Sequence, residues 1–184
     1  MPRPILFLAL LASLAAAGLY FWDSGEPQES EASLAQKHLA KTYLVNTRSL
    51  RYGERGALTE ILEATSVRYF PNQNHSVLVA PKYYSHNGND RTWSVVSDTG
   101  RFLDNRELLF LQGNVVLTDD QNEGRLYTEA MQINLQKKTA RSRVPVTLKQ
   151  GLNTITADGM LADLNKEQIR LTPNVESIYA PVSP

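Results

Sequence analysis

The stretch LLFLQGNVVL, Leu108 to Leu117, places two aliphatic runs on either side of Gln112-Gly113-Asn114. Leu109, Leu111, Val115 and Leu117 share one alternating set, which is the pattern of a β-strand with one buried face. A glycine inside such a strand is typical of a bulge or a corner. We therefore predict a strand that bends near Gly113.

The same pattern recurs along the chain. Three segments of one design begin at Val96, Tyr127 and Thr156, so they are 31 and 29 residues apart. Each segment has a strand, a polar turn and a returning strand, and a weaker copy precedes them. A period near thirty made of hairpins indicates units that bury their apolar faces only by stacking on their neighbours.

The returning strands are interrupted at corresponding places. Pro81, Pro145 and Pro173 lie there in three units, and Gly113 takes a neighbouring place in the fourth. Residues of this kind occur in sheets at edges, bulges or corners. We therefore expect an all-β domain in which bent strands pass between two facing antiparallel sheets, as in a jellyroll or a sandwich.

The N-terminal segment predicts export. Ile5 to Trp22 carries no charge for eighteen residues, and as a helix it would reach roughly 27 Å, close to the hydrocarbon thickness of a bilayer. Arg3 precedes it, which places the short tail in the cytoplasm. The alternative is a signal peptide cleaved after Ala17, and either interpretation exports the domain. The expected organisation is a cytoplasmic tail at 1–4, a transmembrane helix at 5–22, a tether at 23–41, in which 34–41 could form a short helix, and a β domain at 42–184.

The composition excludes several functions. Lys plus Arg equals Asp plus Glu at 19 each, so the excess of positive charge typical of a nucleic-acid-binding protein is missing. The chain has no cysteine, which excludes disulfides, thiolate metal sites, thiol nucleophiles and a lipid-modified cysteine. We expect no cofactor.

Catalytic and metal sites have little support. The three histidines, His38, His75 and His86, show no ligand-type spacing. The stretch Asp119 to Gly124 imitates half of a calcium loop, but Ala130 stands where the closing Glu is required, so a polar turn is the simpler interpretation. An exported hydrolase or metalloenzyme remains only a minor hypothesis, and a binding protein is the simplest conclusion.

The apolar stripe has two interpretations. The aliphatic residues could fill a closed core, as such residues usually do. If the sheets stay partly open, the same stripe lines a long apolar groove for acyl chains, at about 0.8 kcal/mol per buried methylene. An exported, membrane-anchored β stack with such a groove would suit lipid handling.

Three motifs carry a resemblance to a known family. They are GALTEILEA (56–64), TWSVVSDTGRFLDNRELLFLQGNVVL (92–117) and RLYTEAMQINL (125–135). Together with the membrane span and the tether, they resemble the LptC family, the inner-membrane-anchored component of the lipopolysaccharide export bridge. The likeness covers nearly the whole chain.

The resemblance implies a β-jellyroll of the type shared by the bridge proteins (OstA-like or LptA-like), no enzymatic activity and an acyl-chain groove. It also implies an inner-membrane location with the bulk of the chain in the periplasm. A non-lipid-binding scaffold that recruits a jellyroll partner is the alternative. On strand parity, the groove would comprise Thr47, Leu78, Trp93, Val95, Leu111, Val115, Ile133, Leu148 and Ile169.

The resemblance also implies partners that join by strand addition at open edges. An N-terminal edge (43–52) would face the inner-membrane lipopolysaccharide ABC transporter, and a C-terminal edge (168–179) would be offered to the soluble periplasmic protein LptA. The implied contact residues are Tyr43, Leu44, Val45 and Leu50 on the first edge and Ile169, Leu171, Val175 and Ile178 on the second.

Overall fold

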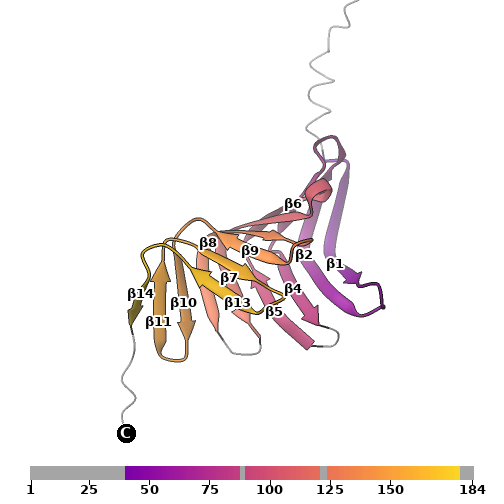
Figure 1. The fold of residues 1–184 in the computed structure, drawn as a ribbon. Coiled ribbons are helices and arrows are strands. Elements are labelled where there is room, and N and C mark those ends of the chain that lie inside the picture. The colour runs from indigo at the N-terminus through magenta and orange to yellow at the C-terminus, as the bar shows by residue number, and fades with distance from the viewer. Residues whose placement is uncertain (1–39, 88–89, 121–123, 179–184) are drawn as a thin grey trace, which may run out of the picture. The chain divides into compact units, whose positions relative to one another are not determined.

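The computed structural model describes residues 40–87, 90–120 and 124–178, and these residues form an all-β body (Figure 1). The expected tail at 1–4, the helix at 5–22 and almost all of the tether, including 34–39 of the short helix, lie outside the described residues. Within the described part of the chain, no helix has the length and apolar character needed to span a bilayer. The body begins where the predicted β domain begins, since its first strand starts at Thr42.

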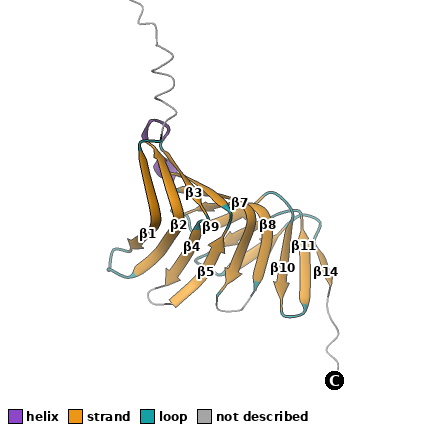
Figure 2. Cartoon of the chain, turned by 180° about the vertical axis from the view of Figure 1, so that it is seen from behind, coloured by secondary structure: helices purple, strands orange, loops and turns teal. Residues whose placement is uncertain are grey.

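The described residues contain fourteen strands and two single-turn 3₁₀ helices (Figure 2). Their bounds are β1 Thr42–Tyr52, β2 Leu58–Phe70, η1 Pro71–Gln73, β3 His75–Val79, β4 Lys82–Asn87, β5 Asp90–Val96, β6 Thr99–Leu103, η2 Asp104–Arg106, β7 Leu108–Asp119, β8 Arg125–Asn134, β9 Thr139–Ser142, β10 Val146–Gln150, β11 Asn153–Ala157, β12 Met160–Asp163, β13 Gln168–Leu171 and β14 Glu176–Ile178.

The strands form two layers. The first layer contains β3, β6, β9, β12 and β13 together with one half of each of the long strands β2, β7 and β8. The second layer contains β4, β5, β10, β11 and β14 together with the other half of each long strand. β7 pairs with β6 through Leu108–Gln112 and with β5 through Val116–Asp119. Because β2, β7 and β8 run through both layers, the layers are one continuous antiparallel sheet folded on itself. Bent strands that pass between two facing layers were predicted from the sequence, and the structure shows that they join the layers into one sheet.

The predicted bend in β7 is present. The pairing of β7 with β8 shifts register between Gln112 and Val115, and Gly113 and Asn114 both have positive φ, at 78° and 46°. Asn46, Ala80 and Asn174 also have positive φ where the chain crosses between layers. Residues with positive φ therefore lie along the line where the sheet bends from one layer into the other. We call this line the corner.

The repeat is visible at the corner as one hydrogen bond made twice. Asn114 Nδ2 donates to Asp98 Oδ2 at 2.7 Å, and Asn174 Nδ2 donates to Asp158 Oδ2 at 2.6 Å. These pairs lie two units apart in the sequence. In the unit between them, Thr128 Oγ1 donates instead to the carbonyl of Pro145 at 2.9 Å. Short polar bonds of this kind hold the bent backbone at a position where regular ladder bonds are interrupted.

The opposite ends of the units also repeat. Asn74, Glu107, Lys138 and Glu167 each have positive φ between 48° and 54° at the hairpin turns of the first layer. The polar pairs that the sequence places in these turns, such as Lys137-Lys138, therefore lie at the edge opposite the corner. We call this the open edge, because no strand there connects the two layers in the described residues.

The Gly113→Ala substitution tests the corner. A Cβ at residue 113 would lie 2.6 Å from Asp98 Oδ2, and φ is +78°. Gly56 is a matched control, since φ is +76° but a Cβ would meet nothing within 4 Å. We expect Gly56→Ala to lower the free energy of unfolding by about 1 kcal/mol. Gly113→Ala should lower it by at least about 2 kcal/mol, because the Asp98–Asn114 bond must also shift. Urea unfolding measures both values, and equal losses would contradict the proposed role of the corner.

Candidate functional site

The interior between the two layers is an apolar surface built from facing rows of side chains. In the second layer, direct cross-strand partners form the row Leu62, Tyr83, Val95, Leu117, Leu126, Leu148 and Ile155. In the first layer, the corresponding row is Phe102, Leu109, Ile133, Ala140, Ala162 and Ile169. Alternation along each strand sends these residues inward and their neighbours outward.

The nine predicted groove residues lie on this interior. Leu78, Trp93, Val95, Leu111, Val115 and Ile133 are buried in its core. Leu148 and Ile169 are half-buried and pack against the core. Thr47 is half-buried as well, and its Oγ1 donates to the carbonyl of Ala64 at 3.3 Å.

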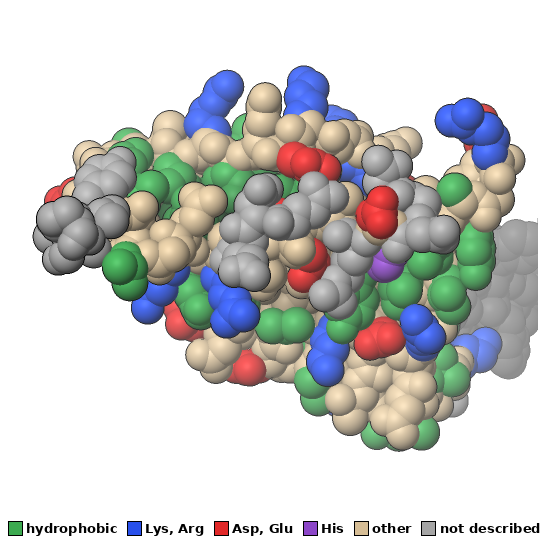
Figure 3. Space-filling model, turned by 90° about the horizontal axis from the view of Figure 1, so that it is seen from below, with side chains coloured by type: hydrophobic (Ala, Val, Ile, Leu, Met, Phe, Trp, Pro, Cys, Tyr) green, Lys and Arg blue, Asp and Glu red, His purple; other side chains and the backbone are tan. Residues whose placement is uncertain are grey.

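The interior is filled in its middle, whereas the sequence predicts a trough open along its length. Val95, Val115 and Ile133 are 0 % exposed, because the two apolar faces gain most by packing on each other. Towards the ends of the stack the packing loosens, at Leu62 and Val67 on β2 and at Leu148, Ile169 and Leu171 on the other side. Seen from below, hydrophobic side chains form a band between polar and charged ones (Figure 3).

A polar margin borders the apolar interior at the open edge. Arg51, Glu60, Ser85 and Trp93 are direct cross-strand partners on β1, β2, β4 and β5. Glu60 and Trp93 are buried, at 4 % and 1 % exposed. Trp93 Nε1 is buried without a hydrogen-bond partner within the described residues. The predicted groove residues include Trp93 but not Arg51, Glu60 or Ser85, because strand parity alone does not show that charged side chains lie beside the interior.

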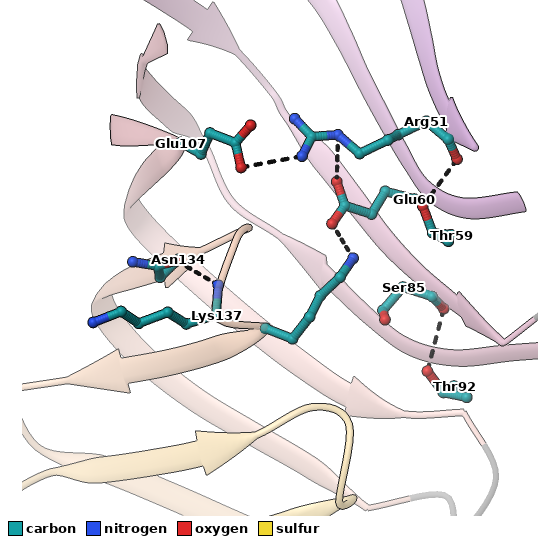
Figure 4. A network of polar contacts seen from close by, with 9 residues as sticks. Arg51, Thr59, Glu60, Ser85, Thr92, Glu107, Asn134 and Lys137 are labelled. Atoms are coloured by element: carbon teal, nitrogen blue, oxygen red, sulfur yellow. Dashed lines mark hydrogen bonds and ion pairs between the residues drawn. The ribbon is translucent and has the colours of Figure 1, made fainter. Parts of the chain in front are cut away.

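Ion pairs from this margin cross the open edge (Figure 4). Lys138, at a turn of the first layer, contacts Glu60 Oε1, and Arg51 Nε lies 3.3 Å from Glu60 Oε2. A terminal nitrogen of Arg51 also lies 3.2 Å from Oε2 of Glu107, at another turn of the first layer. We call these four residues the latch. A buried carboxylate requires partners of opposite charge, and the latch provides two for Glu60.

Tyr83 lies beside the latch. Its burial raises the pKa of the hydroxyl, and the neighbouring Glu60 carboxylate raises it further. The hydroxyl therefore keeps its proton and remains a hydrogen-bond donor at the boundary between the margin and the apolar rows. The interior thus combines a surface for hydrocarbon with a charged border, an arrangement that suits an amphiphile.

The predicted partner residues lie at the ends of the folded sheet. β1 pairs only with β2, so one long side is an edge that exposes Tyr43, Leu44, Val45 and Leu50. At the other end the chain differs from the prediction of one edge strand over 168–179. It crosses the corner at Pro173 and forms two edges, β13 in the first layer and β14 in the second. Ile169 and Leu171 lie on β13, Ile178 lies on β14 and Val175 lies between them.

Other surfaces offer less. A hollow of about 750 Å³ lies on the outer face of the first layer, bordered by Arg101, Arg141 and Arg143, and the Arg101 guanidinium lies 5.6 Å over the Phe110 ring. Within residues 40–87, 90–120 and 124–178, no group of three or more acidic, His or Cys side chains is placed to hold a metal ion. His75 stacks on Phe70 with ring centroids 4.9 Å apart.

Comparisons with known proteins agree with this geometry. A crystal structure of LptH from Pseudomonas aeruginosa, described as the LptA-homologous periplasmic component of the lipopolysaccharide transport device, is similar in fold. The TM-score is 0.51 at 12 % sequence identity, covering 66 % of this chain and 95 % of that one. This supports the predicted LptA-like jellyroll. A search of curated protein sequences finds no match.

The family comparison covers most of the chain. The model described as "Lipopolysaccharide-assembly, LptC-related" matches residues 8–180, which confirms the resemblance carried by the motifs at 56–64, 92–117 and 125–135. Proteins of this transport-bridge type are not known to be enzymes. The chain therefore belongs to the LptC family and has a role in lipopolysaccharide transport.

Proposed function

We propose that this protein binds lipopolysaccharide directly and transfers it, with the acyl chains held between the two layers and the headgroup at the open edge. The observation that carries the proposal is that one interior combines the apolar rows with the polar margin at the open edge. A ligand with both hydrocarbon and anionic groups matches both parts at once. Each methylene that leaves water for the interior contributes about 0.8 kcal/mol.

Acyl-chain entry requires the two layers to part along the open edge. Strands connect the layers at the corner, whereas at the open edge the ion pairs of the latch join them. The half-buried side chains at both ends, such as Leu62 and Leu148, are already partly accessible. These ends are therefore where an acyl chain first replaces contacts between the layers.

The edges suggest the route of transfer. We propose that β1 joins the inner-membrane lipopolysaccharide ABC transporter and that the β13 and β14 edges join a soluble LptA-type jellyroll, each by strand addition. Residues 5–22 would anchor the protein in the inner membrane, with the β domain in the periplasm. Such joining would continue the apolar interior from one protein into the next, because the partly exposed inner side chains lie at the same ends as the edge strands.

The second candidate function is a scaffold that binds partners but no lipid. The filled middle of the interior favours it, since Val95 and Ile133 leave no exposed surface there. In that case the apolar rows serve only as the hydrophobic core, and the edge strands bind the partners.

A crosslinking experiment separates the two functions. A photoreactive residue at Leu148 or Ile169, both half-buried on the inner face, should label lipopolysaccharide in cells, because acyl chains contact these positions. The neighbouring residues Lys149 and Arg170 are exposed on the outer face of the same strands, so they serve as matched controls and should give little product. Immunoblotting for lipopolysaccharide measures the adducts. Absence of inner-face labelling, or equal labelling on both faces, would refute lipid binding between the layers.

Charge placed on the C-terminal edge should weaken partner binding. We expect Ile178→Lys to reduce affinity for a purified LptA-type partner at least tenfold, because a lysine on an edge strand opposes strand addition. Leu152→Lys is the control, since Leu152 is similarly exposed, at 79 % against 72 % for Ile178, but lies in a turn. Isothermal titration calorimetry gives both affinities. An equal loss for the two variants would argue that the β14 edge has no special role.

A further inference from the structure

We propose that Arg51 and Lys138 form a binding site for a phosphate group of the lipid headgroup, and that the Glu60 carboxylate occupies this site when no lipid is bound. The proposal rests on the proposed function, because it concerns where the headgroup lies once the acyl chains are between the layers. It adds a specific anion-binding site to the polar margin.

The geometry of Glu60 defines the site. One carboxylate contacts both cations, through Oε1 to Lys138 Nζ and through Oε2 to Arg51 Nε. The two nitrogens therefore already lie within reach of the oxygens of a single small oxyanion. A phosphate group presents oxygens to the same two donors, and Arg and Lys are the usual partners of phosphate in proteins.

The burial of the site favours a ligand with an anchor in the interior. The Glu60 side chain is 5 % exposed and the Lys138 side chain 20 % exposed, so a dissolved anion has poor access. A phosphate that is covalently attached to an acyl-bearing headgroup arrives at the open edge as the acyl chains enter. Trp93 Nε1, a buried donor without a partner in the described residues, lies on the same cross-strand row as Glu60, with Ser85 between them.

The exchange of anions also explains how the layers are released. Lys138 belongs to the first layer, whereas Arg51 and Glu60 belong to the second. While Glu60 holds Lys138, the open edge is closed in the region of β1 and β2. A phosphate that takes the place of the Glu60 carboxylate frees this contact and keeps both cations paired, and the displaced Glu60 carboxylate becomes hydrated as the layers part.

Two neutral variants separate this site from a simple latch. Glu60→Gln and Lys138→Gln both break the ion pair across the open edge, but the first keeps both cations and the second removes one. For lipid A with its phosphates, we expect Glu60→Gln to bind severalfold more tightly than wild type and Lys138→Gln about tenfold more weakly. For lipid A treated with phosphatase, the two variants should have affinities within about twofold of each other.

Matched controls test the effect of charge alone. Glu63 lies three residues from Glu60 on β2 and pairs with Arg48 at 3.2 Å on the outer face, so Glu63→Gln changes net charge equally outside the site. Lys137→Gln does the same for Lys138, since Lys137 is exposed in the same turn. Both controls should bind each lipid like wild type. Lys138→Arg keeps the positive charge and should retain the preference for the phosphorylated lipid.

Fluorescence anisotropy of labelled lipid with the full-length protein in detergent gives these affinities, and circular dichroism shows that each variant is folded. If both variants shift binding of phosphorylated lipid A in the same direction, the residues act only as a latch and the phosphate site is refuted. If wild type binds neither lipid, the proposed lipid binding fails and the site fails with it. If phosphatase treatment changes the affinity of neither wild type nor Lys138→Gln, acyl binding stands and only the phosphate site is wrong.

Discussion

The fold of the sheet along its corner is the constraint on which the rest of the structure depends. β2, β7 and β8 bend there and continue in both layers, so their hydrogen bonding joins the layers into one sheet. Asn114 and Asn174 adopt left-handed backbone conformations at the bend, and their side chains bond to Asp98 and Asp158. Because strand alternation is preserved on both sides of each bend, the apolar faces of the layers must meet.

The folded sheet produces two unlike borders around one apolar interior. At the corner the backbone itself connects the layers, whereas at the open edge the latch of Arg51, Glu60, Glu107 and Lys138 bridges them. Backbone connections cannot be exchanged for a ligand, but ion pairs can be exchanged for other ion pairs. We therefore propose the open edge as the side on which a lipid enters and on which its anionic headgroup is bound.

The filled middle of the interior and the proposed lipid binding describe two states of the same surface. Val95, Val115 and Ile133 pack closely, because burying apolar walls removes them from water. The loosely packed ends and the exposed edge strands lie together, at β1 on one side and at β13 and β14 on the other. This placement is consistent with the role of the LptC family in lipopolysaccharide transport, since a jellyroll joined at either end would extend the interior.

The sequence by itself determined the strand periodicity, the thirty-residue unit and the bend at Gly113, because these depend on neighbours along one chain. The inward parity of residues such as Leu111 and Ile133 was a prediction from strand alternation, and a slip of one residue in register would have exposed the opposite set. It predicted strands that bend from one layer into the other, but it did not reveal which strands pair or that the edge predicted at 168–179 divides between the layers, since pairing partners come from distant units. The latch was also beyond its reach. Glu60 and Lys138 are 78 residues apart, and only the stacking of the units brings a buried carboxylate and a turn lysine together across the open edge.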